Sequence, residues 1–232
     1  MKLVQQDLKQ STGWLSQNQQ AQLLPLIEQS FSDVDAQAYL TKYFTANDAF
    51  DRRLRLYYAG ERIVGYCLLT LHHQQGIILV KASAAFYPEF RQGGNTFSFS
   101  LLEVTKLKLR HPFRRIYYAD TMLSPAMYRA MAKNVAHVYP APDMPANTET
   151  LFKQFNANGI YSEYAKRTCL VDAGRKTNYS AEEVASFKQN NKPEISYYCK
   201  ANPNFDRGIA LFVIMPITLR QFIATAIKLL VQ

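Results

Sequence analysis

The segment Arg91-Gln92-Gly93-Gly94-Asn95-Thr96 has the composition of a phosphate-binding loop. It lies between an apolar, strand-like run at residues 77–86 and a helix-like run that begins at Thr96. A glycine-rich turn between a strand and a helix presents backbone N–H groups and the positive end of the helix dipole to an anion. The segment lacks the Lys-Ser ending of a loop that binds nucleoside triphosphates. It therefore favours a pyrophosphate that belongs to another kind of molecule.

Hydrophobic periodicity predicts the elements that must position this loop. Two helices come first, followed by a three-stranded antiparallel meander, the loop, a helix, another strand and a short helix. We expect the helices at residues 16–31, 35–44, 96–109 and 125–133. We expect the strands at residues 53–58, 62–71, 77–86 and 115–120. The strand–helix–strand order implies a parallel crossover from 77–86 to 115–120. The predicted fold class is therefore α/β, with a mixed, mainly antiparallel sheet flanked by helices.

The second half of the chain follows a proline-rich connector at residues 139–145. Helices are predicted at 148–156 and, from the capping-box pattern of Ser180 and Glu183, up to about residue 189; strands are predicted at 167–171, 197–199 and 209–215. We expect a core over residues 1–172. Residues 173–232 are then an extension of a helix, a strand pair and an amphipathic helix, packed on that core.

The last predicted helix carries one apolar stripe, made of Leu219, Phe222, Ile223, Ala226, Ile227 and Leu230. Such a stripe is expected to pack against the protein's own sheet or against a second subunit, which would make a homodimer. The alternative is docking on a membrane surface, with Arg220 and Lys228 facing the lipid head groups. Polar residues interrupt the run, so a spanning helix is not expected.

Composition narrows the partners and the compartment. The 232-residue chain carries a net charge of +9, which favours anionic partners, but its basic residues are dispersed except over 106–115, so no nucleic acid is expected. The three cysteines, Cys67, Cys169 and Cys199, form no ligand grouping, so we predict no metal and no disulfide framework. Residues 1–10 lack the apolar core of a signal peptide. These features predict a cytoplasmic protein.

Over residues 15–135, the order of elements and the loop resemble the GNAT superfamily of acyl-CoA-dependent N-acyltransferases. The family's loop has Gln or Arg, two free positions, Gly, one free position, and then Gly or Ala. Arg91 and Gly94 match the first two fixed positions, whereas Thr96 stands where Gly or Ala is usual. The resemblance implies transfer of an acyl group, most often acetyl, from acetyl-CoA or another acyl-CoA to an amine acceptor.

The resemblance also implies site residues. Backbone groups of Gln92, Gly93, Gly94, Asn95 and Thr96 would bind the pyrophosphate, with Arg91 beside them, and the strand end at Phe86 would line the pantetheine slot. Tyr128, on the helix at 125–133, matches a tyrosine that protonates the departing thiolate in this family. Its hydroxyl, with an ordinary pKa near 10, is protonated at neutral pH.

No general base is evident on the strand at 77–86, which has no Glu, Asp or His. His72 and His73, at the end of the preceding strand, are the nearest substitutes, and a water chain is the alternative. Adjacent strand residues point to opposite faces, so at most one of the two histidines would face a cleft. Thr96 and the missing base leave a second hypothesis open, a binding or scaffold protein with this fold that has lost catalysis.

Overall fold

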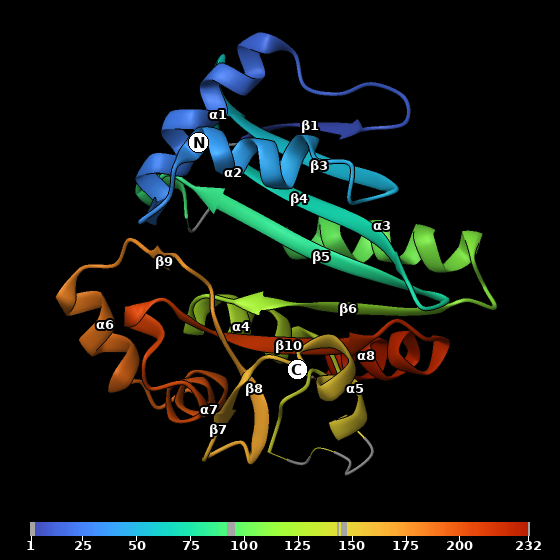
Figure 1. The fold of residues 1–232 in the computed structure, drawn as a ribbon, viewed down its shortest axis with the longest axis vertical. Helices are drawn as coiled ribbons and strands as arrows, with labels where there is room; N and C mark the ends of the chain where they lie inside the picture. Colours follow the sequence, from blue (N-terminus) through green and yellow to red (C-terminus); the bar gives the residue numbers. More distant parts are fainter. Residues whose placement is uncertain (1–2, 92–95, 143, 145–147, 232) are drawn as a thin grey trace. The chain divides into compact units, whose positions relative to one another are not determined.

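The computed structural model describes residues 3–91, 96–142, 144 and 148–231 (Figure 1). The chain is α/β, with mainly antiparallel strands flanked by helices, which confirms the predicted fold class. It divides into two compact units, Met1–Ile116 and Tyr117–Gln232. The predicted boundary after residue 172 lies inside the second unit, at the end of a strand. The predicted parallel crossover would join the two units and stays a prediction.

The first unit is built on four antiparallel strands in the order β1-β3-β4-β5. Its elements are β1 (Val4–Lys9), α1 (Gln17–Ser30), β2 (Phe31–Ser32), α2 (Ala36–Leu40), the π-helix η1 (Thr41–Thr45), β3 (Asp51–Ala59), β4 (Arg62–Gln74), β5 (Ile77–Phe86), the 3-10 helix η2 (Pro88–Phe90) and α3 (Thr96–Arg110). The meander β3-β4-β5 follows the predicted hairpins closely.

Helices cover both faces of this meander. On β4, the Tyr66 hydroxyl lies 3.2 Å from that of Tyr39 in α2, whereas the neighbouring Cys67 places its Sγ 3.7 Å from the Ser100 Oγ in α3. Successive strand residues point to opposite faces. Helices α2 and α3 therefore pack on opposite sides of the meander, and β4 is buried between them over most of its length.

The second unit also contains four antiparallel strands, in the order β6-β10-β8-β7. Its elements are β6 (Arg115–Met122), α4 (Pro125–Asn134), α5 (Glu149–Phe155), β7 (Ile160–Ser162), β8 (Arg167–Asp172), β9 (Lys176–Thr177), α6 (Ala181–Lys188), α7 (Pro193–Ala201), the 3-10 helix η4 (Phe205–Arg207), β10 (Ile209–Pro216) and α8 (Leu219–Val231). Helices α4 and α7 pack together through Tyr128, Tyr197 and Tyr198.

The predicted helix starts are confirmed by their caps. Ser16 and Ser180 each form a complete capping box, and the Ser124 hydroxyl accepts a hydrogen bond from the Met127 N–H with Pro125 at the first helical position. Each cap satisfies N–H groups that have no partner inside the helix. These local signals fix the starts of α1, α4 and α6.

One predicted strand is wrong. Residues 197–199 lie in helix α7, not in a strand. The Tyr-Tyr-Cys sequence favours strands locally, but Pro193 opens a helix, and Ile195, Tyr198 and Ala201 recur at helical spacing and are buried. Packing of this face overrides the local propensity. The short strands β1 and β7 were not predicted, because β1 is largely polar and β7 has three residues.

Candidate functional site

The carboxyl end of β5 is held by its neighbours on both sides. Phe86 pairs with Gly65 of β4, and its ring lies over that glycine: a Cβ at position 65 would come within 2.1 Å of the ring. The ring also packs on Tyr57, with centroids 4.9 Å apart. The Phe86 carbonyl accepts a hydrogen bond from the Ser30 hydroxyl at the end of α1. Phe86 is thus a buried anchor at the predicted pantetheine strand.

Beyond Phe86, the 3-10 helix η2 leads to Arg91, and α3 is the next described element. The Arg91 N–H donates to the Pro88 carbonyl at 3.3 Å, and the Arg91 and Thr96 side chains are half-buried. Helix α3 begins at Thr96 with no acidic residue in its first turn, and its last turn carries Lys108 and Arg110. The predicted residues Gln92, Gly93, Gly94 and Asn95 lie outside the described residues.

Tyr128 lies in the second unit, inside the contact between α4 and α7. Its side chain is 2% exposed, and its hydroxyl donates a hydrogen bond to the Pro140 carbonyl at 2.8 Å. The Tyr197 and Tyr198 rings lie 5.9 and 5.8 Å from its own. Burial raises the pKa of Tyr128 well above its usual value, with the neighbouring Tyr197 adding to the shift. The hydroxyl keeps its proton and holds it against a backbone carbonyl.

The two histidines tie the end of β4 to residues 48–50. The two ring nitrogens of His72 lie 3.0 Å from the Asp48 carbonyl oxygen and 2.9 Å from the Thr70 hydroxyl. Because a carbonyl only accepts, Nδ1 carries the proton and Nε2 of the neutral ring accepts from Thr70. Burial lowers the pKa of His72, and the charge of Lys81 adds to this effect. The His73 ring stacks on Phe50 at 4.1 Å.

Two buried polar groups in the first unit were not predicted. Tyr39, Tyr66 and Ser83 form a cluster of hydroxyls. The Ser83 Oγ lies 2.5 Å from the Tyr39 hydroxyl oxygen and 3.1 Å from that of Tyr66. The only sequence signal was a serine within the apolar run of β5.

Arg52 is 1% exposed, and its guanidinium donates to the carbonyls of Tyr43 and Ala46. Nothing in the local sequence sets this arginine apart from its neighbour Arg53.

Cys67 is a buried free thiol. Burial raises its pKa to about 12, which opposes formation of the nucleophilic thiolate.

Of the predicted site residues, Phe86, Arg91 and Thr96 follow one another in the first unit, and Tyr128 belongs to the second. The structure thus describes the two ends of the predicted loop and the surroundings of the predicted proton donor.

The structure is similar to solved structures of GNAT-family proteins, the family that the sequence resembles. With a GNAT-family protein of Desulfovibrio desulfuricans, the TM-score is 0.40 and the identity 8%, over 93% of this chain and 100% of that one. With the ribosomal-protein-S18-alanine N-acetyltransferase of Escherichia coli, the TM-score is 0.39 and the identity 6%, over 92% of this chain and 96% of that one. With a GNAT-family acetyltransferase of Streptococcus pneumoniae, the TM-score is 0.37 and the identity 10%, over 57% of this chain and 87% of that one. No family model and no curated protein matches the chain.

Proposed function

We propose that the protein is an acyl-CoA-dependent N-acyltransferase that transfers an acyl group, most simply acetyl, directly to an amine. The observation that carries this proposal is the succession of strand β5, 3-10 helix η2, Arg91 and helix α3, which follows an antiparallel meander. The glycine pair between Arg91 and Thr96 lies in the connection of this unit. A strand that leads through such a connection into a helix can present backbone N–H groups and the helix dipole to a pyrophosphate.

The described residues at this connection fit an anionic group. Helix α3 has 15 residues, and its only carboxylate, Glu103, lies two turns from the start, where Lys106 pairs with it at 2.7 Å. No acidic side chain in the first turn opposes a phosphate, and Lys108 and Arg110 complement the other end of the dipole. Arg91 adds a cation before the helix. These features support a site for the pyrophosphate of acyl-CoA.

Acyl-CoA, when bound, supplies an activated thioester, and the chain would supply position and a proton. The helix start and Arg91 would hold the phosphates, and the amides of β5 would orient the pantetheine arm. The amine would attack the thioester carbonyl, Tyr128 would donate its proton to the departing sulfur, and the phenolate would regain a proton from the nitrogen of the newly acylated amine. Its raised pKa keeps that proton in place at neutral pH, but the hydroxyl must first exchange its bond to the Pro140 carbonyl.

Tyr128→Phe tests the proton donor, and Tyr198→Phe is its matched control. Both changes remove a buried hydroxyl that donates to a backbone carbonyl, at 2.8 Å to Pro140 and at 2.7 Å to Met122. Each should therefore cost roughly 1–3 kcal/mol of stability. Release of free thiol from acetyl-CoA is followed with a mixture of polyamines, amino acids and short peptides as acceptors.

We expect Tyr128→Phe to lower kcat by about 10²-fold or more with an unchanged KM for acetyl-CoA, because a positioned acid contributes that much. Tyr198→Phe should keep its turnover. Equal turnover in the two variants would make Tyr128 a packing residue only. If acetyl-CoA binds but no acceptor releases thiol, the catalytically inactive alternative gains support.

A further inference from the structure

Helix α8 presents its apolar side outward and its polar side inward. Its exposed stripe consists of Leu219, Ile223, Ile227, Leu230 and Val231, which are 67%, 63%, 57%, 86% and 82% exposed. The buried residues of the helix are Gln221 and Thr225, at 4% and 5% exposure. Five of the six residues of the stripe predicted to pack on the sheet or on a second subunit are thus exposed in this chain, and the sixth, Phe222, is half-buried. Contiguous apolar surface of this kind marks an interaction site.

Hydrogen bonds fix this orientation of α8. The Gln221 side chain donates to the His137 carbonyl at 2.8 Å, and the Thr225 hydroxyl accepts from the Ala136 N–H at 3.2 Å. The Lys228 ammonium donates to the Ala132 and Val135 carbonyls, at 2.7 and 3.0 Å. Rotating the helix to bury its stripe would break all of these bonds and leave backbone groups near the end of α4 without partners. The stripe is held outward.

The charged residues of α8, and of α4 that packs against it, are all cationic. They are Arg129, Lys133, Arg220 and Lys228, with no aspartate or glutamate in either helix. The Lys228 ammonium is turned toward α4, and Arg129 faces Glu194 of α7 at 3.7 Å, so Lys133 and Arg220 are the exposed cations. An aliphatic stripe with cationic flanks is complementary to a surface of acyl chains beneath anionic head groups.

We propose that α8 docks the protein on an anionic phospholipid surface, with its stripe buried among the acyl chains near the head groups. No helix among the described residues is long and apolar enough to cross a membrane. The 13 residues of α8 span about 20 Å, less than the roughly 30 Å hydrocarbon core, so the helix lies in the plane of the interface.

A second copy of the chain fits this stripe less well. One stripe of five aliphatic side chains presents less area than the roughly 800 Å² that each partner buries in a stable complex. In a symmetric dimer the cationic flanks of the two copies would also face each other. A lipid surface presents neither problem, because its area is unlimited and its charge is opposite.

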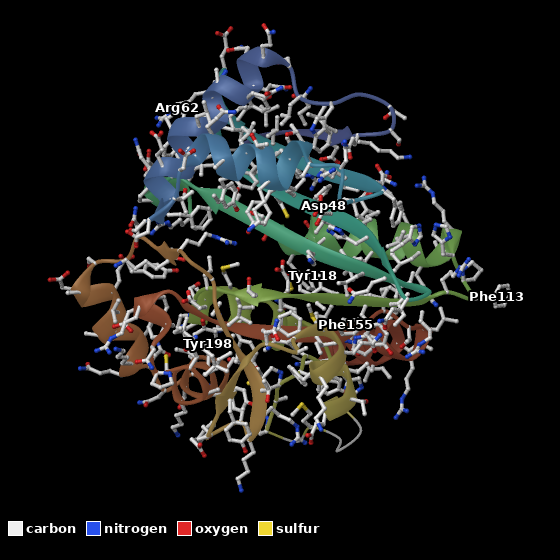
Figure 2. All side chains as sticks on the ribbon, viewed as in Figure 1. Asp48, Arg62, Phe113, Tyr118, Phe155 and Tyr198 are labelled. Carbon is white, nitrogen blue, oxygen red and sulfur yellow. The ribbon has the colours of Figure 1, made fainter. Side chains whose placement is uncertain are left out.

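The first unit carries a separate feature with the same chemistry. Phe113, in the turn after α3, is 99% exposed and points away from the ribbon (Figure 2). The turn is held by the Lys108 ammonium, which donates to the Pro112 and Arg114 carbonyls at 2.8 and 3.0 Å. Residues 104–116 contain no acidic residue. An exposed ring among cations suits the head-group region of an anionic membrane.

Vesicle flotation tests the proposal with the full chain. Vesicles of phosphatidylcholine alone are compared with vesicles that also contain phosphatidylglycerol. The test variant is Ile223→Ser with Ile227→Ser. The matched control is Val4→Thr with Ile160→Thr, two aliphatic residues that are 65% and 47% exposed on strands β1 and β7. All four positions are exposed, so the melting temperatures of both variants should stay close to that of the natural chain.

We expect binding to the anionic vesicles, weaker binding at high salt, and at least a tenfold loss of affinity in Ile223→Ser with Ile227→Ser, while the control binds normally. Two results would overturn the proposal: no flotation of the natural chain at low salt, or equal flotation of both variants. Light scattering provides a third. A dimer in the natural chain that dissociates in the α8 variant would assign the stripe to a second copy. Because no acyl-CoA enters this experiment, its outcome is independent of the proposed enzymatic function.

Discussion

At the scale of single residues, Tyr128 and Tyr198 illustrate how position decides the role of a side chain. Both are buried, both donate to a backbone carbonyl, and burial raises the pKa of both. Their sequence context does not separate a packed tyrosine from a proton donor. Only the place of Tyr128 on the helix after β6, together with the resemblance to a family, distinguishes it. The two phenylalanine variants therefore separate packing from proton donation.

Gly65 offers a prediction at the same scale. Its Cβ, if present, would lie within 2.1–2.7 Å of the Phe86 ring, so Gly65→Ala must displace that ring from the end of β5. We expect a loss of about 1–3 kcal/mol of stability, measured by chemical denaturation. Gly13→Ala is the control, because a Cβ at position 13 meets nothing within 4 Å. Equal stability of the two variants would show that the ring moves freely.

At the scale of elements, polar side chains hold the connection that follows the π-helix η1. Arg52 donates to the carbonyls of Tyr43 and Ala46 and forms an ion pair with Asp48 at 2.8 Å. His72 adds its contact with the Asp48 carbonyl. These bonds satisfy carbonyls near the end of the π-helix η1 that have no helical partner. The segment thus depends on two side chains from the sheet.

His72 makes the stability of this connection depend on pH. Burial lowers its pKa in the folded chain below the ordinary value of 6.5, so the unfolded chain takes up a proton first as the pH falls. The stabilisation is fully present above about pH 6.5 and is lost as the pH falls toward the folded pKa. We expect the unfolding free energy of the natural chain to fall more steeply from about pH 7 to pH 5 than that of His72→Asn.

Asparagine suits this comparison because its amide can replace the Nδ1 donor to the Asp48 carbonyl without titrating in this range. Chemical denaturation at a series of pH values gives the two slopes. Parallel slopes for the natural chain and His72→Asn would contradict a lowered pKa at this position.

At the scale of the whole molecule, the sequence predicted most elements but not the side chains that join them. The meander, the helices with serine caps and helix α3 followed from periodicity and capping patterns, which are local. Helix α7 was missed because its Tyr-Tyr-Cys run favours a strand, whereas Pro193 at its start and packing against α4 make it helical. The contacts of Arg52 and the hydroxyl cluster of Tyr39, Tyr66 and Ser83 join distant parts of the chain. No local pattern encodes such contacts.

The orientation of α8 shows the same limit. Periodicity located the apolar stripe correctly, but it does not state which side of a helix faces the protein. The hydrogen bonds of Gln221, Thr225 and Lys228 to residues 132–137 decide that question. They join α8 to residues at and after the end of α4, about 90 positions earlier in the chain. The candidate phosphate site from Phe86 to Thr96 was inferred from consecutive residues, and it stays a prediction.

Calorimetric titration with acetyl-CoA tests the central claim most directly, because acyl transfer requires that this cofactor bind. Arg91→Ala is compared with Arg110→Ala, which removes the same charge from the opposite end of the 15-residue helix α3. We expect saturable binding by the natural chain, about a tenfold or greater loss of affinity in Arg91→Ala, and normal affinity in Arg110→Ala, since a hydrogen bond to a charged group contributes about 1.5–3 kcal/mol. Absence of saturable heat at millimolar acetyl-CoA, in a chain shown to be folded, would contradict the proposed function.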